Sequence, residues 1–334
     1  VANAVGMAIA EAHLAARFNR PDHTIVDHRT RVLASDGDLM EGVAAEAASL
    51  AGHLQLGKLN VLYDDNHICL AGSTSLSFSE DVGARFAAYG WHVQRVEDGN
   101  DLAAVETALR AAQDDSRPSL VCLRTRIGFG APTKQGTFEV HGSPLGPDEL
   151  RGAKAALGWP AEPAFWIPPE ALANFRQALG RGQQAEHQWE QRRAAYERAH
   201  PAEAAEFRRV MAGELPAGWD RDLPVFPADA KGIATRKAGE GVLQAIAARL
   251  PELMGGSADL NPSTFTWIKG AGDFEPAAAT QAGAQGAVGG VWSYGGRNLH
   301  FGIREHAMGA AVNGMALHGG LIPYGSTFLM FADY

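Results

Sequence analysis

The sequence predicts an α/β protein built on parallel sheets, with two α/β domains joined by a helical linker. Short apolar runs alternate with amphipathic, alanine-rich stretches over residues 1–159. This pattern stops over residues 160–229 and returns over residues 230–334. Of the 334 residues, 46% are apolar and 20% are charged, which is enough for two domains with cores of their own.

The first domain is expected to alternate helices and strands in order. Apolar spacing from Ala2 to Leu14 indicates an opening helix. Short buried strands are predicted at residues 30–34, 59–63, 92–96 and 120–124, with helices at 39–54, 80–89 and 101–113 between them. We expect the second helix of the chain to end near Leu56 with Gly57 as its cap, and the helix at 101–113 to follow the turn that begins at Asp98.

The linker and the second domain differ in composition. Residues 160–229 begin with several prolines and continue as a helical stretch rich in Gln, Glu and Arg, where Trp189, Tyr196 and Phe207 are expected to attach it to a domain surface. The second domain is predicted to contain a helix at 236–250, a strand ending at Gly255, a strand at 299–302 and a helix at 304–317.

Charge and cysteine usage exclude several classes of protein. The formal charge of −9 leaves no basic surplus for nucleic acid or an anionic bilayer, so we expect neither partner. The most apolar stretch, residues 308–331, is interrupted by polar residues, proline and glycines and does not fit a membrane span. Cys69 and Cys122 cannot form a disulfide framework, which favours the cytoplasm. Neither end of the chain carries a cap or a terminating turn, so we interpret it as an internal fragment.

Polar residues follow two successive predicted strands. Ser35, Asp36 and Gly37 come directly after residues 30–34, and Asn66 follows residues 59–63. Neighbouring parallel strands end at the same edge of a sheet, so these side chains can converge on one crevice. Hard oxygens there suit Mg²⁺ bound to a diphosphate, and the helix near Leu39 would add N-terminal amides. The alternative for an Asp-Gly pair after a strand is an ordinary turn.

Further polar clusters lie in the second half of the chain. Asp259 and Ser263 follow a predicted strand and belong either to a turn-rich loop or to a substrate loop. Arg236 and Lys237 form either a solvated face or a phosphate clamp. Glu305 begins a helix of many small residues, where it either complements the helix dipole or, if buried by tight packing, transfers a proton. Taken by itself, His141 is interpreted as a loop histidine.

The ordered motifs of the chain closely resemble those of transketolases. They are the opening helix 2–10, Ser35-Asp36-Gly37 with Asn66, residues 127–130, His141-Gly142, residues 233–237, residues 256–260 and residues 303–306. The resemblance implies a thiamine-diphosphate-binding fold, truncated in both domains: residues 1–159 as the diphosphate-binding domain without its N-terminal part, 160–229 as the linker, and 230–334 as the start of the pyrimidine-binding domain. Transketolases move a two-carbon ketol unit from a ketose phosphate to an aldose phosphate, in sugar-phosphate metabolism, as homodimers with the pocket between subunits.

The resemblance also implies roles for individual residues. Asp36, Asn66 and the carbonyl of Ile68 would hold Mg²⁺ or Ca²⁺, with Gly37 and Glu41 near the diphosphate or the subunit contact. Glu305 would hydrogen-bond the aminopyrimidine ring and promote its imino tautomer. The remaining expected roles are an aromatic wall (Phe328, Phe331, Tyr334), substrate phosphate binding (Arg236, Ser263), the thiazolium side of the cofactor (Asp259), and contact with both diphosphate and substrate (His141).

The chain departs from the family pattern at Ser35, where glycine is usual, a change expected to weaken cofactor binding modestly. We expect little or no turnover from these 334 residues alone. Two alternatives remain. One is a 1-deoxyxylulose-5-phosphate synthase-like enzyme or the decarboxylating part of a 2-oxo-acid dehydrogenase, against which Arg236-Lys237 and residues 256–259 argue. The other is a non-catalytic transketolase-like subunit.

Overall fold

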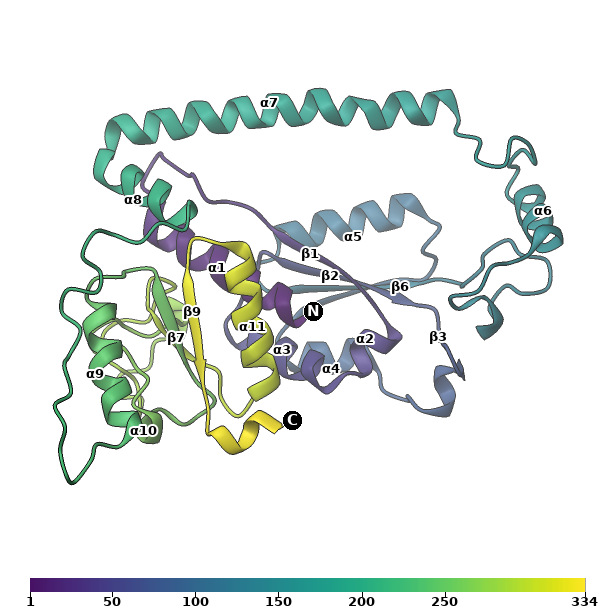
Figure 1. Cartoon of the computed structure of the whole chain (residues 1–334). Helices are drawn as coiled ribbons and strands as arrows, with labels where there is room; N and C mark the ends of the chain where they lie inside the picture. Colours follow the sequence, from purple (N-terminus) through teal and green to yellow (C-terminus); the bar gives the residue numbers. More distant parts are fainter. Residues whose placement is uncertain (334) are drawn as a thin grey trace.

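The computed structural model in Figure 1 describes residues 1–333. Its helices are α1 (Ala2–Phe18), α2 (Asp36–Met40), α3 (Gly42–His53), α4 (Val82–Ala88), α5 (Leu102–Asp114), α6 (Pro147–Ala156), α7 (Pro169–Ala199), α8 (Pro201–Met211), α9 (Thr235–Ala247), α10 (Asn261–Thr264) and α11 (Glu305–His318). Its strands are β1 (Thr30–Ser35), β2 (Leu59–Asp65), β3 (Ile68–Cys69), β4 (Gly72–Ser73), β5 (His92–Val96), β6 (Ser119–Arg124), β7 (Leu253–Ser257), β8 (Asn298–His300) and β9 (Ile322–Ser326).

Two parallel sheets confirm the predicted α/β class. The first has the order β1-β2-β6-β5 and the second the order β8-β7-β9, and all their pairings are parallel. In the first sheet Ser35 at the end of β1 is paired with Asp64 near the end of β2. The two strands therefore end at one edge, which places the segments after them side by side.

The predicted helix at 39–54 is wrong in its extent. The structure has two helices there, the five-residue α2 and the longer α3, separated by Glu41 in an extended conformation. The second of these helices ends at His53 rather than Leu56, and the residue with positive φ beyond it is Gln55 (φ 50°), not Gly57. Gly57 instead allows a close approach, since a Cβ there would lie 2.3 Å from the carbonyl oxygen of Ser116.

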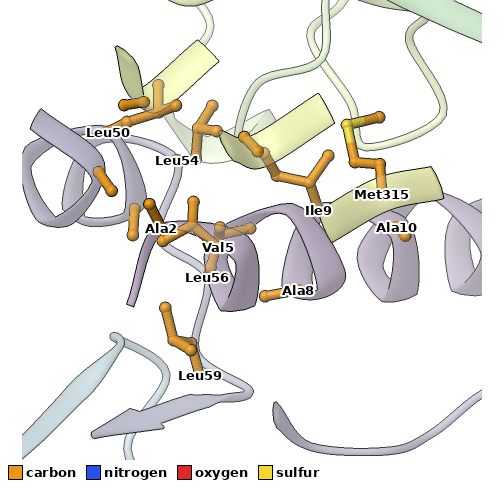
Figure 2. Close-up of a cluster of buried hydrophobic side chains, with 14 of the residues drawn as sticks. Ala2, Val5, Ala8, Ile9, Ala10, Leu50, Leu54, Leu56, Leu59 and Met315 are labelled. Atoms are coloured by element: carbon orange, nitrogen blue, oxygen red, sulfur yellow. The ribbon is translucent and has the colours of Figure 1, made fainter. Parts of the chain in front are cut away.

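One core joins the two halves of the chain. Figure 2 shows Val5 and Ile9 of α1 in a cluster with Leu50 of α3, Leu54 just beyond it, and Met315 of α11. All five side chains are at most 1% exposed. Helix α11 comes from the C-terminal part of the chain, so the two α/β units share buried surface rather than being connected by the linker alone.

The linker is helical and attached at the predicted aromatic residues. Helix α7 runs along the outside of the molecule and turns into α8 (Figure 1). Tyr196 is fully buried and Phe207 is 8% exposed, while the indole of Trp189 donates to the carbonyl oxygen of Ile25 at 3.1 Å. These contacts fix only the C-terminal part of α7, whose earlier turns are exposed. The domain limits at residues 159 and 229 remain predictions.

Candidate active site

Asp36 lies at the carboxyl edge of the first sheet, directly after β1. Its side chain is 2% exposed. The hydroxyl of Tyr63 donates a hydrogen bond to Oδ1, and the backbone amide of His67 donates to Oδ2 at 3.1 Å. The carboxylate is thus held between the end of β2 and the turn that follows it, which brings it beside the segment that contains Asn66 and Ile68.

The electrostatic environment of Asp36 suits a bound cation. Burial raises the pKa of its carboxyl, the hydrogen bond from Tyr63 opposes this shift, and the charge of Asp65 adds to it. A buried carboxylate whose negative charge is disfavoured gains most from a nearby positive ion. Asp36 therefore fits the role of a ligand to a hard divalent cation.

Asn66 adjoins this site, but its side chain is turned back onto its own backbone. Its Oδ1 accepts from the amide of Ile68 at 2.9 Å, and His67 between them has a φ of 64°. Asp36 lines a pocket of about 270 Å³ and Asn66 a neighbouring one of about 830 Å³, with His67 and Arg124 in the walls of both. The structure brings the two segments together, while the Asn66 oxygen faces its own turn.

The donor set offered here is one carboxylate, one amide oxygen and one backbone carbonyl. Within residues 1–333, no three His, Cys, Asp or Glu side chains are grouped so as to hold a metal ion. The predicted ligand set contains only one side chain of these four types, the Asp36 carboxylate. Carboxylate, amide and carbonyl oxygens are the ligands that Mg²⁺ and Ca²⁺ prefer. The residues present therefore fit a hard cation and do not fit a zinc-type site.

The helix expected to supply amides to a diphosphate starts earlier than predicted and is short. Helix α2 begins at Asp36 and is five residues long, and the Ser35 amide and hydroxyl both donate to Asp38 Oδ2 at 2.8 and 3.1 Å. A helix of little more than one turn has a small dipole. Gly37 is exposed, and a Cβ there would meet no atom within 4 Å, so the space beside it is open.

Two further predicted residues of the first domain lie apart from Asp36. Glu41 is exposed at the break between α2 and α3. His141 is half-buried on the loop after β6, where its amide donates to the carbonyl oxygen of Phe138 at 3.0 Å. Among the described residues, the walls of the pockets around Asp36 and Asn66 do not include His141. The structure therefore does not bring Glu41 or His141 into contact with the Asp36 carboxylate.

Glu305 is the first residue of α11 and is half-buried, so packing at the helix start does not bury its side chain fully in this chain. The helix start is nonetheless anchored to the first domain. The amide of Ala307 donates to Glu46 Oε2 at 2.9 Å, and Arg304 donates to the hydroxyl of Ser49 at 3.0 Å. Sequence reasoning missed Glu46 and Ser49, because no local pattern indicates partners more than 250 positions away.

Asp259 and the residues near Arg236 lie in two different pockets. Asp259 follows β7 with a φ of 60° and lines a pocket of about 720 Å³ that also contains His53, Glu275 and Arg304. Glu275 is 4% exposed and forms an ion pair with His53 at 3.2 Å. The hydrogen bond from His53 to Glu275 raises the pKa of the histidine.

Arg236, Ser263 and Phe328 share a pocket of about 690 Å³ (Figure 1 shows the adjoining α9, α10 and β9). Arg236 Nη1 lies 3.5 Å from the carbonyl oxygen of Ser263. Helix α9 starts at Thr235, and its N-cap residue Ala234 has no side chain to accept from the first amides. A guanidinium beside uncapped helix amides is a suitable site for a phosphate group.

The aromatic segment at the end of the described chain contributes to the same region. The rings of Phe328 and Phe331 stack with centroids 6.3 Å apart and planes 22° apart. Tyr334, predicted as the third aromatic residue of the wall, lies outside the described residues.

The fold is that of an α/β protein with two parallel-sheet units. Oxygen donors that suit a hard cation lie at the edge of one sheet, and groups that suit a phosphate line a pocket in the other unit. The comparisons with known proteins agree. A family model described as "Transketolase, thiamine diphosphate binding domain" matches residues 1–216, and one described as "Transketolase, pyrimidine binding domain" matches residues 231–334. The chain belongs to the transketolase family, as the sequence resemblance predicts.

Individual relatives support the same assignment. Transketolases of a Nostoc species and of Geobacillus stearothermophilus are each 51% identical to this chain, over 100% of it and 48% of the relative. The solved transketolase of Leishmania mexicana superposes with a TM-score of 0.92 at 45% identity, and that of Campylobacter jejuni with 0.84 at 32%; each match covers 100% of this chain and 48% of the other. The chain thus spans about half the length of the relatives it matches.

Within residues 1–333 no helix is long and apolar enough to cross a membrane.

Proposed function

We propose that the full-length protein transfers a two-carbon ketol unit from a ketose phosphate to an aldose phosphate, with thiamine diphosphate and a divalent cation as cofactors. The observation that carries this proposal is the pocket where Arg236, Ser263 and the start of α9 meet Phe328. It joins groups suited to a phosphate with an aromatic surface suited to a heterocyclic ring. A solved transketolase of Pichia stipitis is described as a complex with sedoheptulose 7-phosphate, which belongs to the proposed substrate class.

We assign the divalent cation, Mg²⁺ or Ca²⁺, to Asp36, Asn66 and the carbonyl of Ile68. The support is the buried Asp36 carboxylate, its raised pKa and the oxygen character of its neighbours. In this structure Asn66 Oδ1 accepts a hydrogen bond from the Ile68 amide. To bind the cation, the Asn66 side chain has to break that hydrogen bond and turn its oxygen toward the ion.

The other residues would bind and orient the cofactor. When bound, thiamine diphosphate supplies a nucleophilic carbon and accepts electrons from the donor sugar. Glu305, half-buried at the start of α11, would hold a proton at the pyrimidine ring, and Phe328, Phe331 and Tyr334 would pack against that ring. Asp259 would lie on the thiazolium side, while Gly37, Glu41 and His141 would lie toward the diphosphate, with His141 also contacting substrate.

The proposed active form is a homodimer in the cytoplasm with its sites between subunits. In support, the residues assigned to the divalent cation line pockets separate from the one that contains Phe328 and the residues assigned to the substrate phosphate. A second copy would supply the missing half of each site. The 334 residues alone are expected to turn over little, because they span about half the length of the relatives.

The test is a ketol-transfer assay on the full-length protein, using xylulose 5-phosphate and ribose 5-phosphate after removal of metal and cofactor. We expect activity only when both thiamine diphosphate and Mg²⁺ are restored. Consumption of pyruvate in place of ketol transfer would favour a 1-deoxyxylulose-5-phosphate synthase-like enzyme or the decarboxylating part of a 2-oxo-acid dehydrogenase. Absence of cofactor binding in calorimetry would favour a non-catalytic subunit.

A further inference from the structure

Phe265 lies against both cations at the start of α9. Its ring centroid is 3.8 Å from Lys237 Nζ and 5.7 Å from Arg236 Cζ. Both distances fall within the range of cation–π attraction. Lys237 is also paired with Glu240 at 3.2 Å, so its charge is partly balanced on the helix itself. Arg236 is the one of the two cations that lines the pocket with Ser263.

The backbone of Phe265 is unusual for a bulky residue. It has a φ of 56° and a ψ of 39°, in the left-handed region, where it ends the short helix α10. Glycine is the residue that adopts this conformation without steric cost. A phenylalanine here keeps a strained backbone while it places an aromatic ring beside two cations, and strain retained beside a pocket is an indication of function.

Arg236 has few other contacts that restrict it. It is exposed, and its guanidinium is 3.5 Å from the carbonyl oxygen of Ser263, a long hydrogen bond. A freely rotating arginine loses conformational entropy when it binds an anion. The Phe265 ring already restricts the motion of the Arg236 guanidinium, so less conformational entropy is lost on binding. Preorganisation of this kind increases affinity.

We propose that Phe265 is a positioning residue that orients Arg236 toward the terminal phosphate of the sugar substrate. Phe265 thereby increases the preference for phosphorylated over non-phosphorylated sugars. This inference rests on the proposed function, because it takes the pocket of Arg236 and Ser263 as the place where the substrate phosphate binds.

The test uses the full-length protein with Phe265→Leu, which keeps an apolar side chain and removes the aromatic face, and Phe265→Tyr, which keeps that face. KM and kcat are measured for xylulose 5-phosphate and for the non-phosphorylated ketose erythrulose. We expect Phe265→Leu to raise KM for the phosphorylated donor about fivefold with kcat unchanged, the size expected for one cation–π contact. KM for erythrulose should stay the same, and Phe265→Tyr should behave as the wild type.

Two controls separate a local effect from a loss of folding. Phe175→Leu on α7 removes a ring that is 76% exposed and does not line the pocket of Arg236 and Ser263. This variant should have the wild-type KM for both donors. Phe265→Gly removes the backbone strain together with the ring; we expect a thermal midpoint at least as high as that of wild type and the same rise in KM. An equal change of KM for both donors, or no change in either, would overturn the proposal.

A binding measurement distinguishes failure of this inference from failure of the proposed function. Inorganic phosphate is titrated into wild type, Phe265→Leu and Phe175→Leu and followed by calorimetry. Weaker binding in Phe265→Leu alone supports the positioning role even if the protein transfers no ketol unit. Equal phosphate affinity in all three proteins contradicts the positioning role even if ketol transfer is observed.

Discussion

A Cβ atom on Gly314 of α11 would lie 1.9 Å from the carbonyl oxygen of Asn3 on α1. The same two helices meet again where a Cβ on Gly6 would lie 2.0 Å from the carbonyl oxygen of Ala311. Backbone therefore touches backbone at two points along this contact. Because α1 belongs to the first α/β unit and α11 to the second, this helix pair fixes how the two units are placed relative to each other.

Gly314→Ala should destabilise the protein. The added methyl group meets backbone that cannot move aside, and overpacking of this kind costs about 1–3 kcal/mol, which exceeds the helix propensity gained by alanine. Denaturant titration gives the change in unfolding free energy. Gly309→Ala is the matched control on the same helix, since a Cβ there meets nothing within 4 Å. It should be neutral or slightly stabilising, and equal effects of the two variants would contradict the packing described here.

Stability should fall as the pH decreases from about 6.5 to about 4, in part because of His13. This side chain is 1% exposed, and burial lowers its pKa to about 4 from an unperturbed value of 6.5. Between these values the unfolded chain binds a proton that the folded chain does not, so up to about 1.4 kcal/mol of stability is lost per pH unit from this group. Above pH 6.5 this loss is absent.

The measurement is the unfolding free energy of wild type and His13→Leu at several pH values. The variant should be less stable near neutral pH, since the Tyr294 carbonyl loses its partner at 2.9 Å, and the difference should narrow toward pH 4. His187→Gln, at an exposed position on α7, is the control and should leave the pH dependence unchanged. A difference between wild type and His13→Leu that does not vary with pH would exclude this role for His13.

Asp36→Asn should weaken divalent-cation binding at least tenfold, as expected when a charged oxygen ligand is lost. In the absence of metal the variant should be at least as stable as wild type near neutral pH. Since the folded-state pKa of Asp36 is raised, its ionised form opposes folding at pH values above that pKa. Calorimetry with Mg²⁺ and thermal unfolding in chelator give the two quantities. Asp38→Asn, at an exposed position two residues on, should keep its metal affinity.

Glu305→Gln in the full-length protein should leave thiamine diphosphate affinity nearly unchanged, because the amide keeps the shape of the side chain. It should reduce kcat by at least a hundredfold, because the amide cannot take up the proton. Cofactor titration and a steady-state assay measure the two effects. This pattern is the opposite of that expected for Asp36→Asn. If both variants lost cofactor affinity equally, the division between a metal ligand and a proton-holding residue would be wrong.

Much of the fold could be predicted because it depends on local pattern. The strand at 92–96 has the predicted limits, and the other strands of the first sheet differ from theirs by one or two residues. Alternating apolar runs specify such buried parallel strands directly. The residues that attach the linker, Trp189, Tyr196 and Phe207, were also predictable, because aromatic side chains are the largest apolar groups that a polar helix can pack against a domain.

Local conformations that depend on neighbouring segments were predicted less well. The break at Glu41 divides an apolar, alanine-rich stretch that reads as one helix, and a capping interaction between Ser35 and Asp38 starts α2 three residues early. Glu305 is only half-buried although its neighbours are small, because Ala311 and Gly314 pack α11 against α1 further along the helix.

By itself the sequence determined the class of fold, the family and the segments that carry polar residues at strand ends. Only the tertiary structure decided that Glu46 caps α11, that Phe265 meets Arg236 and that the Asn66 side chain accepts from the amide of Ile68. The physical reason is the sequence separation over which each effect acts. Periodicity and turn preference act over a few residues, whereas these contacts form when packing brings side chains from different segments within a few ångströms of each other.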